Sequence, residues 1–152
     1  MKKVDFEGLS FYQFDIFPKG SVVHGIFTRK GGISEGSFSS LNVSGSSGDF
    51  HENVVENRRR IFSAIQRNPK SIFDVWQVHS SKVVFVDEPR GQGEKHIQAD
   101  AILTRSSKVS LFMQFADCVP IMVYDPEQKI IGTIHAGWQG TVKRIVQETI
   151  KY

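Results

Sequence analysis

Hydrophobic and polar residues alternate in two stretches near the start of the chain, residues 10–17 and 21–28. Phe, Tyr, Ile and Val supply the apolar positions of both stretches. A period of two is typical of half-buried β-strands, because successive side chains of a strand point to opposite faces. Pro18-Lys19-Gly20 lies between the stretches and favours a turn. The pattern therefore predicts two strands joined at this tripeptide.

Residues 31–50 contain five Gly and seven Ser, and a few apolar residues interrupt them. This composition predicts an ordered loop, with a free linker as the alternative. Asp49 and Glu52 then resemble a capping box with Asp49 as the cap. Asn68-Pro69 is expected to end the helix that follows. Its apolar residues recur at helical spacing: Val54, Val55, Ile61, Phe62 and Ile65.

The second half of the chain is dominated by β-rich runs that Gly, Pro, Asp or Ser separate. These runs cover residues 72–76, 83–86, 109–115, 119–124 and 130–134. They predict a mixed sheet. After the last run, residues 137–141 open a helix whose apolar stripe is Val142, Ile145, Val146 and Ile150. We expect an α+β fold, with helices packed on a mixed β-sheet.

Length and composition are those of a packed globular protein. The 152 residues suit one domain, 39% are hydrophobic, and 23% are charged. The formal net charge of +3 is small and scattered, so we expect no nucleic-acid partner. No stretch approaches the roughly 18 apolar residues of a membrane span, and no signal peptide precedes the first strand. We therefore expect a cytoplasmic protein with no membrane partner.

Three segments place metal-compatible side chains at the ends of predicted strands. They are Gln77-Val78-His79-Ser80, Ala116-Asp117-Cys118-Val119-Pro120 and Ile134-His135-Ala136-Gly137-Trp138. One thiolate and two imidazoles suit Zn²⁺ and leave a fourth position open for water. Taken alone, each of these residues is more often a packing or surface residue than a metal ligand. The helix start at residues 137–141 would also offer free N–H groups to phosphate.

The same three segments resemble the family of multicopper polyphenol oxidoreductases, or laccase-domain proteins, in order and context. The resemblance runs from about residue 24 to the end of the chain. Further matching motifs are Thr28-Arg29-Lys30-Gly31-Gly32-Ile33-Ser34, Ser40-Leu41-Asn42, Gly48-Asp49, Glu56-Asn57-Arg58-Arg59 and Ala99-Asp100-Ala101.

The resemblance implies a zinc-dependent purine nucleoside phosphorylase that also deaminates adenosine, with a purine nucleoside and phosphate as its partners. By this likeness His79, Cys118 and His135 are the catalytic metal ligands. Asn42 and Arg58 are implied as substrate- or phosphate-binding residues. We further expect Asp117 to be the catalytic acid, and Gly137 and Gln139 to be substrate-binding residues.

Two departures from the family pattern shape further expectations. Gln139 stands where the family usually has Arg, which removes one positive charge beside the expected site. The family usually continues through further strands, so we expect residues 1–152 to be a single, C-terminally truncated domain, although a docked final helix is also an ordinary end. An unfinished sheet edge predicts self-association.

Other functions remain open at this point. A four-copper laccase needs more than the five histidines and one cysteine present. A single blue-copper site with Met113 or Met122 as axial ligand would have no use for an open helix end. Cys118 with His135 or His79 as its base would suit a cysteine hydrolase or deamidase. A non-catalytic purine- or metal-binding module is the remaining alternative.

Overall fold

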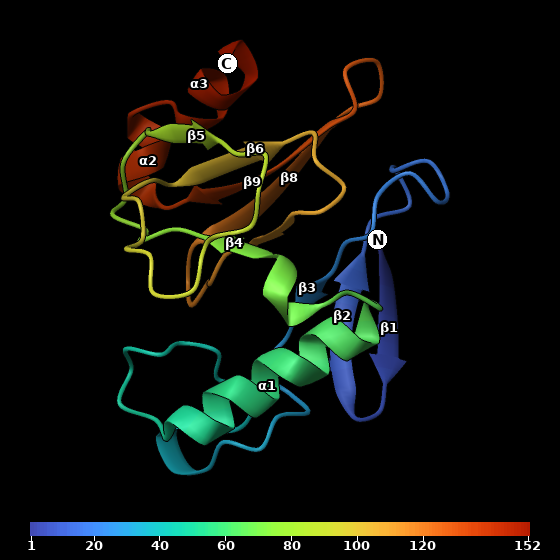
Figure 1. Ribbon diagram of the computed structural model, residues 1–152, viewed down its shortest axis with the longest axis vertical. Coiled ribbons are helices and arrows are strands. Elements are labelled where there is room, and N and C mark those ends of the chain that lie inside the picture. Colours follow the sequence, from blue (N-terminus) through green and yellow to red (C-terminus); the bar gives the residue numbers. More distant parts are fainter. The chain divides into compact units, whose positions relative to one another are not determined.

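The computed structural model describes residues 1–152, and the chain divides into two compact units, Met1–Pro69 and Lys70–Tyr152 (Figure 1). We describe each unit by itself. Antiparallel and mixed sheets occur together with helices, which confirms the predicted α+β class. The single-domain expectation stays a prediction.

The first unit contains a three-stranded antiparallel sheet in the order β1-β2-β3. Its strands are β1 (Lys2–Phe6), β2 (Leu9–Gln13) and β3 (Ile26–Phe27). Glu7 and Gly8 join β1 to β2 with φ of 47° and 84°, as a two-residue hairpin turn of type I′ requires. The alternation did not reveal β1, and the strand expected over 21–28 shortens to two residues. The turn at Pro18 is confirmed, because Ser21 N–H donates to Pro18 O at 3.0 Å.

Helix α1 (His51–Ala64) follows the glycine- and serine-rich segment. The expectation that Asp49 caps it is wrong by one residue, since Phe50 is the N-cap and makes no side-chain bond there. Asp49 Oδ1 instead accepts from Phe50 N–H at 2.8 Å. The helix also ends before Asn68-Pro69, because Gln66 adopts a left-handed φ of 53°. Its buried face is Val54, Asn57, Ile61 and Phe62.

Residues 31–50 form an ordered loop rather than a linker. A short 3₁₀ helix, η1 (Gly36–Phe38), lies within it. Asn57 of α1 is fully buried and accepts from Ile33 N–H at 2.9 Å. Its amide nitrogen donates to the Ser34 hydroxyl and to the carbonyls of Ser40 and Asn42. One side chain therefore ties distant parts of the loop to the helix.

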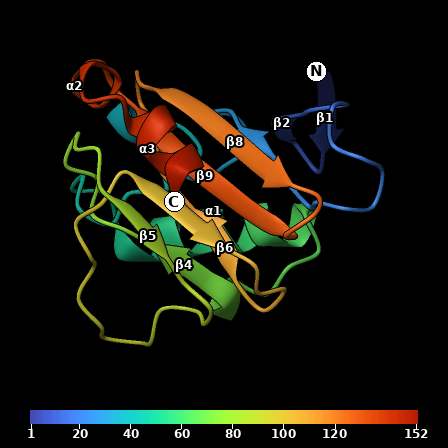
Figure 2. The same cartoon turned by 90° about the horizontal axis from the view of Figure 1, so that it is seen from above.

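A short 3₁₀ helix, η2 (Pro69–Ser71), spans the boundary between the units, and the second unit contains two sheets. The smaller sheet pairs β4 (Ile72–Asp74) with β7 (Ser110–Phe112) in parallel. The larger sheet has the order β5-β6-β9-β8, with β5 parallel to β6 and the other pairs antiparallel (Figure 2). Its strands are β5 (Val83–Phe85), β6 (Ala101–Thr104), β8 (Val119–Asp125) and β9 (Ile130–Ala136). The predicted mixed sheet is thus confirmed.

Strand β6 was not predicted, and its burial explains why. All four of its residues are buried, so it shows no alternation of apolar and polar positions. Ile102 belongs to one apolar cluster with Phe73, while its neighbour Ala101 belongs to another with Ile134 and Ile145. The two faces of β6 therefore support two separate parts of the core.

The C-terminal helix is two helices, α2 (Trp138–Val142) and α3 (Ile145–Lys151). Arg144 separates them with a left-handed φ of 61°. This corrects the expected single stripe, because Ile145 is buried whereas Val142 is 74% and Ile150 68% exposed. Helix α3 packs against β9 and β5 (Figure 2). None of the helices combines the length and apolar character that crossing a membrane demands.

Candidate metal centre

The start of β6, the start of β8 and the end of β9 meet at one end of the larger sheet in the second unit. Because β6 and β8 both run antiparallel to β9, their first residues lie beside the last residues of β9. Cys118 comes directly before β8, His135 is the second-to-last residue of β9, and Asp100 comes directly before β6. The loop that carries His79 joins the same end, since three of its backbone N–H groups donate to Asp100.

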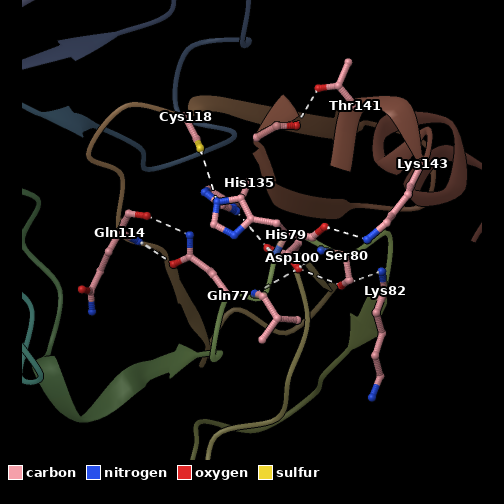
Figure 3. Close-up of polar contacts among 12 residues, drawn as sticks. Gln77, His79, Ser80, Lys82, Asp100, Gln114, Cys118, His135, Thr141 and Lys143 are labelled. Atoms are coloured by element: carbon pink, nitrogen blue, oxygen red, sulfur yellow. Dashed lines mark hydrogen bonds and ion pairs between the residues drawn. The ribbon is translucent and has the colours of Figure 1, made fainter. Parts of the chain in front are cut away.

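The donor atoms of His79, Cys118 and His135 all lie within 4.8 Å of one another (Figure 3). Cys118 Sγ is 3.8 Å from His79 Nε2, and the two imidazole centroids are 4.8 Å apart with their planes at 75°. In a tetrahedral zinc site, Zn–S of about 2.3 Å and Zn–N of about 2.0 Å separate sulfur from nitrogen by about 3.5 Å. The sulfur–nitrogen spacing is close to this value, so the residues fit one metal ion.

Asp100 lies beneath the donor cluster and is completely buried. One of its carboxylate oxygens accepts from Ser80 N–H at 2.6 Å and from the Ser80 hydroxyl at 2.7 Å. The other accepts from His79 N–H at 3.0 Å and is 2.8 Å from His135 Nδ1. Val78 N–H adds a longer bond of 3.3 Å. Both carboxylate oxygens therefore have the hydrogen-bond donors that a buried, ionised carboxylate needs.

Two opposing effects act on the Asp100 carboxyl. Burial raises the pKa of Asp100, but hydrogen bonds from the hydroxyl and N–H of Ser80, from His135 and from Val78 together hold it below its usual value. Asp100 is consequently a carboxylate at neutral pH, and it acts as an acceptor toward all of these groups.

His79 has a left-handed backbone with a φ of 57°. This conformation costs a residue other than glycine about 1–2 kcal/mol. In return, successive N–H groups of Val78, His79 and Ser80 converge on one carboxylate, as in the anion-binding nests of other proteins. Lys143 also donates to His79 O at 3.2 Å. The loop is thus fixed through its backbone, which leaves the imidazole free to face Cys118.

The segment before Cys118 is fixed by Gln77. Its amide nitrogen donates to Gln114 O at 2.8 Å, and its amide oxygen accepts from Gln114 N–H at 3.0 Å (Figure 3). These two bonds join the loop of His79 to the segment that leads into β8. They connect two of the three donors without contacting either one.

Gly137 is the N-cap of α2 and lies against two of the donors. A Cβ built on it would lie 2.7 Å from His79 Cδ2 and 3.0 Å from Cys118 Sγ. Gln139 is half-buried in the first turn of the same helix. Since α2 has only five residues, its N-terminus is a much weaker anion site than the expected long helix would provide.

The other candidate residues are not members of this cluster. Asp117 is exposed and precedes Cys118 in the chain. Asn42 and Arg58 belong to the first unit, where the Asn42 amide nitrogen donates to Ser47 and Asp49. Arg58 donates twice to Val43 O, at 3.0 and 2.8 Å. These contacts give both residues a structural role, and their substrate-binding role stays a prediction.

Asp100 and Gln77 are absent from the candidates chosen by sequence, although both lie in matching motifs. A buried carboxylate needs compensating partners, and an acidic residue directly before a fully buried strand is the signal that could have identified Asp100. Gln77 gives no comparable signal, because its partners are backbone groups of a distant segment.

The fold and the donor cluster define an α+β protein with a candidate metal site at strand ends. Residues 23–152 match the family model described as Multi-copper polyphenol oxidoreductase laccase, and the chain belongs to this family. It is 37% identical over 136 residues to Bacillus subtilis "Purine nucleoside phosphorylase YlmD", covering 86% of this chain and 49% of that protein. It is 32% identical to a Bacteroides thetaiotaomicron "Purine nucleoside phosphorylase", covering 98% and 55% of the two chains.

Solved structures show the same fold. The crystal structure of YlmD from Geobacillus stearothermophilus gives a TM-score of 0.87 at 31% identity and covers 97% of this chain and 56% of its own. The Bacillus licheniformis hypothetical protein YfiH gives 0.84 at 28% identity, with the same coverage. The present chain thus spans about half the length of the relatives that it matches.

Proposed function

We propose that this chain carries the metal centre of a zinc-dependent purine nucleoside phosphorylase that also deaminates adenosine. One observation carries the proposal: two imidazoles and the only thiol converge within 4.8 Å at the strand ends. The names of the relatives support the choice of reaction. The reactions would be inosine plus phosphate giving hypoxanthine and ribose 1-phosphate, and adenosine plus water giving inosine and ammonia.

Zinc is supported over copper by the chemistry of the donor set, although the family description names copper. Thiolate and imidazole suit zinc, and three protein ligands leave one position open, as catalytic zinc sites do. A blue-copper site would add an axial thioether. Met113 is a poor source for it, because it packs against the apolar cluster of Phe73 and Ile102.

His79, Cys118 and His135 would hold the metal, which when bound would supply a Lewis acid for the oxygen of phosphate or water. The protein's own residues orient the reactants. Asp117 is exposed next to Cys118 and is our candidate for the acid that protonates the leaving group. Gly137 leaves room over the donors because it has no side chain. Asn42, Arg58 and Gln139 remain the candidates for contacting nucleoside and phosphate.

The decisive assay is hypoxanthine formation from inosine, with and without phosphate, in the wild type and in Cys118→Ala. The proposal expects turnover that needs phosphate and that falls to background in the variant. His96→Gln is the matched control, since His96 lies in the same unit but contacts Asp74. Activity retained in Cys118→Ala, or a rate that ignores phosphate, would contradict the proposed mechanism.

Two further arms test the finer parts of the proposal. Adenosine without phosphate should yield inosine, and its failure to do so would remove the deaminase activity. Gln139→Arg should lower the KM for phosphate, because one charge-assisted hydrogen bond contributes about 0.5–3 kcal/mol, or roughly 2- to 150-fold. An unchanged KM would remove Gln139 from the phosphate site.

A cysteine hydrolase is the second candidate, and the contact between Cys118 Sγ and His79 Nε2 at 3.8 Å favours it. The base would then be His79, because its Nε2 makes this contact with the sulfur. One sulfur cannot serve as a metal ligand and as a free nucleophile at once. Stoichiometric zinc that is lost in Cys118→Ala supports the phosphorylase, whereas metal-free protein alkylated at Cys118 supports the hydrolase. Binding of zinc or nucleoside without turnover would indicate a binding module.

A further inference from the structure

We infer that Asp100 is the positioning residue of the donor cluster, setting the orientation and tautomer of His135 and the backbone of His79 before any metal binds. The inference rests on the proposed role of these residues as metal ligands. It adds a fourth residue, which is not itself a metal ligand but determines whether His79 and His135 can bind the same metal ion (Figure 3).

The first step concerns the proton of His135. Asp100 receives hydrogen bonds from Val78 N–H, His79 N–H and both donors of Ser80, so its carboxylate oxygens serve as acceptors. His135 Nδ1 lies 2.8 Å from one of these oxygens and must therefore be the protonated nitrogen. Nε2 is left with a free lone pair. This is the tautomer that a metal ligand needs, and a carboxylate behind a ligating imidazole stabilises it.

The second step concerns His79, which Asp100 holds through the backbone. The left-handed φ of 57° would be unfavourable without the three N–H groups that converge on the carboxylate. The same oxygen accepts from His79 N–H and lies against His135 Nδ1. One carboxylate oxygen thus sets the spacing of the two imidazoles.

The third step concerns the backbone of Asp100 itself. His135 N–H donates to Asp100 O at 2.7 Å, and Asp100 N–H donates to Lys82 O at 3.0 Å. Main-chain bonds on both sides fix the residue between β9 and the segment that leads into β5. The carboxylate is therefore held in place independently of a metal, as a preformed site requires.

Asp100→Asn is the informative substitution, because it keeps the shape of the side chain but replaces one acceptor with an NH₂ donor. Two backbone N–H groups, of Val78 and Ser80, donate to one oxygen, whereas only His79 N–H donates to the oxygen beside His135, so the new NH₂ group is expected to turn toward His135. His135 would then accept at Nδ1 and carry its proton at Nε2, where the metal should bind. We expect zinc affinity to fall roughly 10- to 100-fold, the usual effect of losing such a partner.

Asp74→Asn is the matched control within the same unit. Asp74 is also buried, at 4% exposed, and accepts from Arg90 Nε at 2.6 Å with His96 Nε2 at 3.2 Å. It therefore reproduces the loss of a buried carboxylate paired with a histidine away from the cluster. We expect Asp74→Asn to lower the melting temperature but to leave zinc affinity within about twofold of the wild type.

Two measurements decide the inference. Zinc affinity is measured by competition with a chromophoric chelator in the wild type and both variants. The tautomer of His135 is measured on metal-free protein by ¹⁵N NMR of labelled histidine, with His135→Gln for assignment. The expected result is a proton on Nδ1 in the wild type and in Asp74→Asn, and on Nε2 in Asp100→Asn.

The outcomes separate this inference from the proposed function. A wild-type protein with the proton of His135 on Nε2 would overturn the inference, even if no variant folds. Equal zinc affinity in Asp100→Asn and wild type would also overturn it. A wild type that binds no zinc would refute the proposed metal, while the His135 spectrum would still decide whether Asp100 sets the tautomer.

Discussion

A Cβ built on Gly137 would lie 3.0 Å from the sulfur of Cys118, so the first residue after β9 is in contact with the first donor before β8. The backbone of Gly137 has ordinary angles, φ −75° and ψ 168°, which any residue can adopt. Space rather than conformation therefore requires glycine here. The two donors closest to this position, His79 and Cys118, come from separate loops, and a side chain at residue 137 would crowd both of them.

Gly137→Ala should weaken zinc binding without a large loss of fold. The added methyl group would meet His79 Cδ2 at 2.7 Å and push the imidazole away from Cys118. Overpacking of this kind costs about 1–3 kcal/mol, which corresponds to roughly 5- to 150-fold in zinc affinity if the metal-bound state bears the cost. Chelator competition measures the affinity, and the melting temperature measures stability.

Gly45→Ala is the control for that prediction. A Cβ at Gly45 meets nothing within 4 Å, so it introduces a methyl group without crowding. Zinc affinity should be unchanged in it. If Gly137→Ala binds zinc as tightly as Gly45→Ala does, His79 and Cys118 move apart freely and the site is not preformed.

The sequence identified the donors but not what places them. His79, Cys118 and His135 were recognisable as residue types that bind metals at predicted strand ends. The role of Asp100 was not recognised, because it depends on the antiparallel pairing of β6 with β9, and β6 itself was not predicted. Gln77 bonds to the backbone of Gln114, which any residue could offer, so the sequence at position 114 gives no sign of this contact.

The fold shows the same division between local and long-range information. Alternation predicted β2 and β3 with errors at their ends, but it did not reveal β1. β6 was missed because both its faces are buried. The break between α2 and α3 was missed because Arg144 adopts a left-handed φ that residues such as Gly or Asn usually signal. Whether a strand is buried on both faces, and whether a residue adopts a left-handed backbone, depends on long-range packing, which a short stretch of sequence does not reveal.

Asn57→Ala should strongly destabilise the first unit. The substitution removes the partner of Ile33 N–H and the donor to the Ser40 and Asn42 carbonyls, and leaves a cavity in a fully buried position. We expect a loss of about 2–4 kcal/mol. Both tryptophans, Trp76 and Trp138, lie in the second unit, so their fluorescence does not report this change directly. Hydrogen exchange of the α1 amides is the appropriate measurement.

Asn53→Ala is the matched control, since it lies on the same helix and its amide makes only a long bond of 3.4 Å to Asp49. Both substitutions replace Asn by Ala in α1, so the gain in helix propensity cancels in the comparison. A loss below about 0.5 kcal/mol is expected for Asn53→Ala. Similar losses in the two variants would show that Asn57 does not organise the loop of residues 31–50.

Asp49 should make the first unit sensitive to acid. Hydrogen bonds from the Ser34 hydroxyl and the Asn42 amide hold the pKa of Asp49 below its usual value. A carboxyl with a lower pKa in the folded state stabilises the fold above its unfolded pKa of about 3.9, and this contribution is lost as the pH falls through the folded pKa. Asp49→Asn should therefore flatten the decline in protection of the α1 amides below about pH 4.

The control for acid sensitivity is Asp87→Asn, which removes an exposed carboxyl from the second unit. It should leave the pH dependence of the first unit as it is in the wild type. An equally steep decline in Asp49→Asn and in the wild type would mean that the hydrogen bonds to Asp49 do not favour its charged form.

Gln77→Glu should loosen the segment that carries Cys118. Glutamate keeps the acceptor for Gln114 N–H but loses the donor to Gln114 O, and it sets a carboxylate oxygen against that carbonyl at a distance where the amide now donates at 2.8 Å. The segment then leaves its place, so Cys118 in zinc-free protein should be alkylated several-fold faster and zinc should bind more weakly. Gln128→Glu, in the exposed turn between β8 and β9, controls for the added charge. Equal alkylation rates in the wild type and both variants would show that the bonds between Gln77 and Gln114 do not hold Cys118 in place.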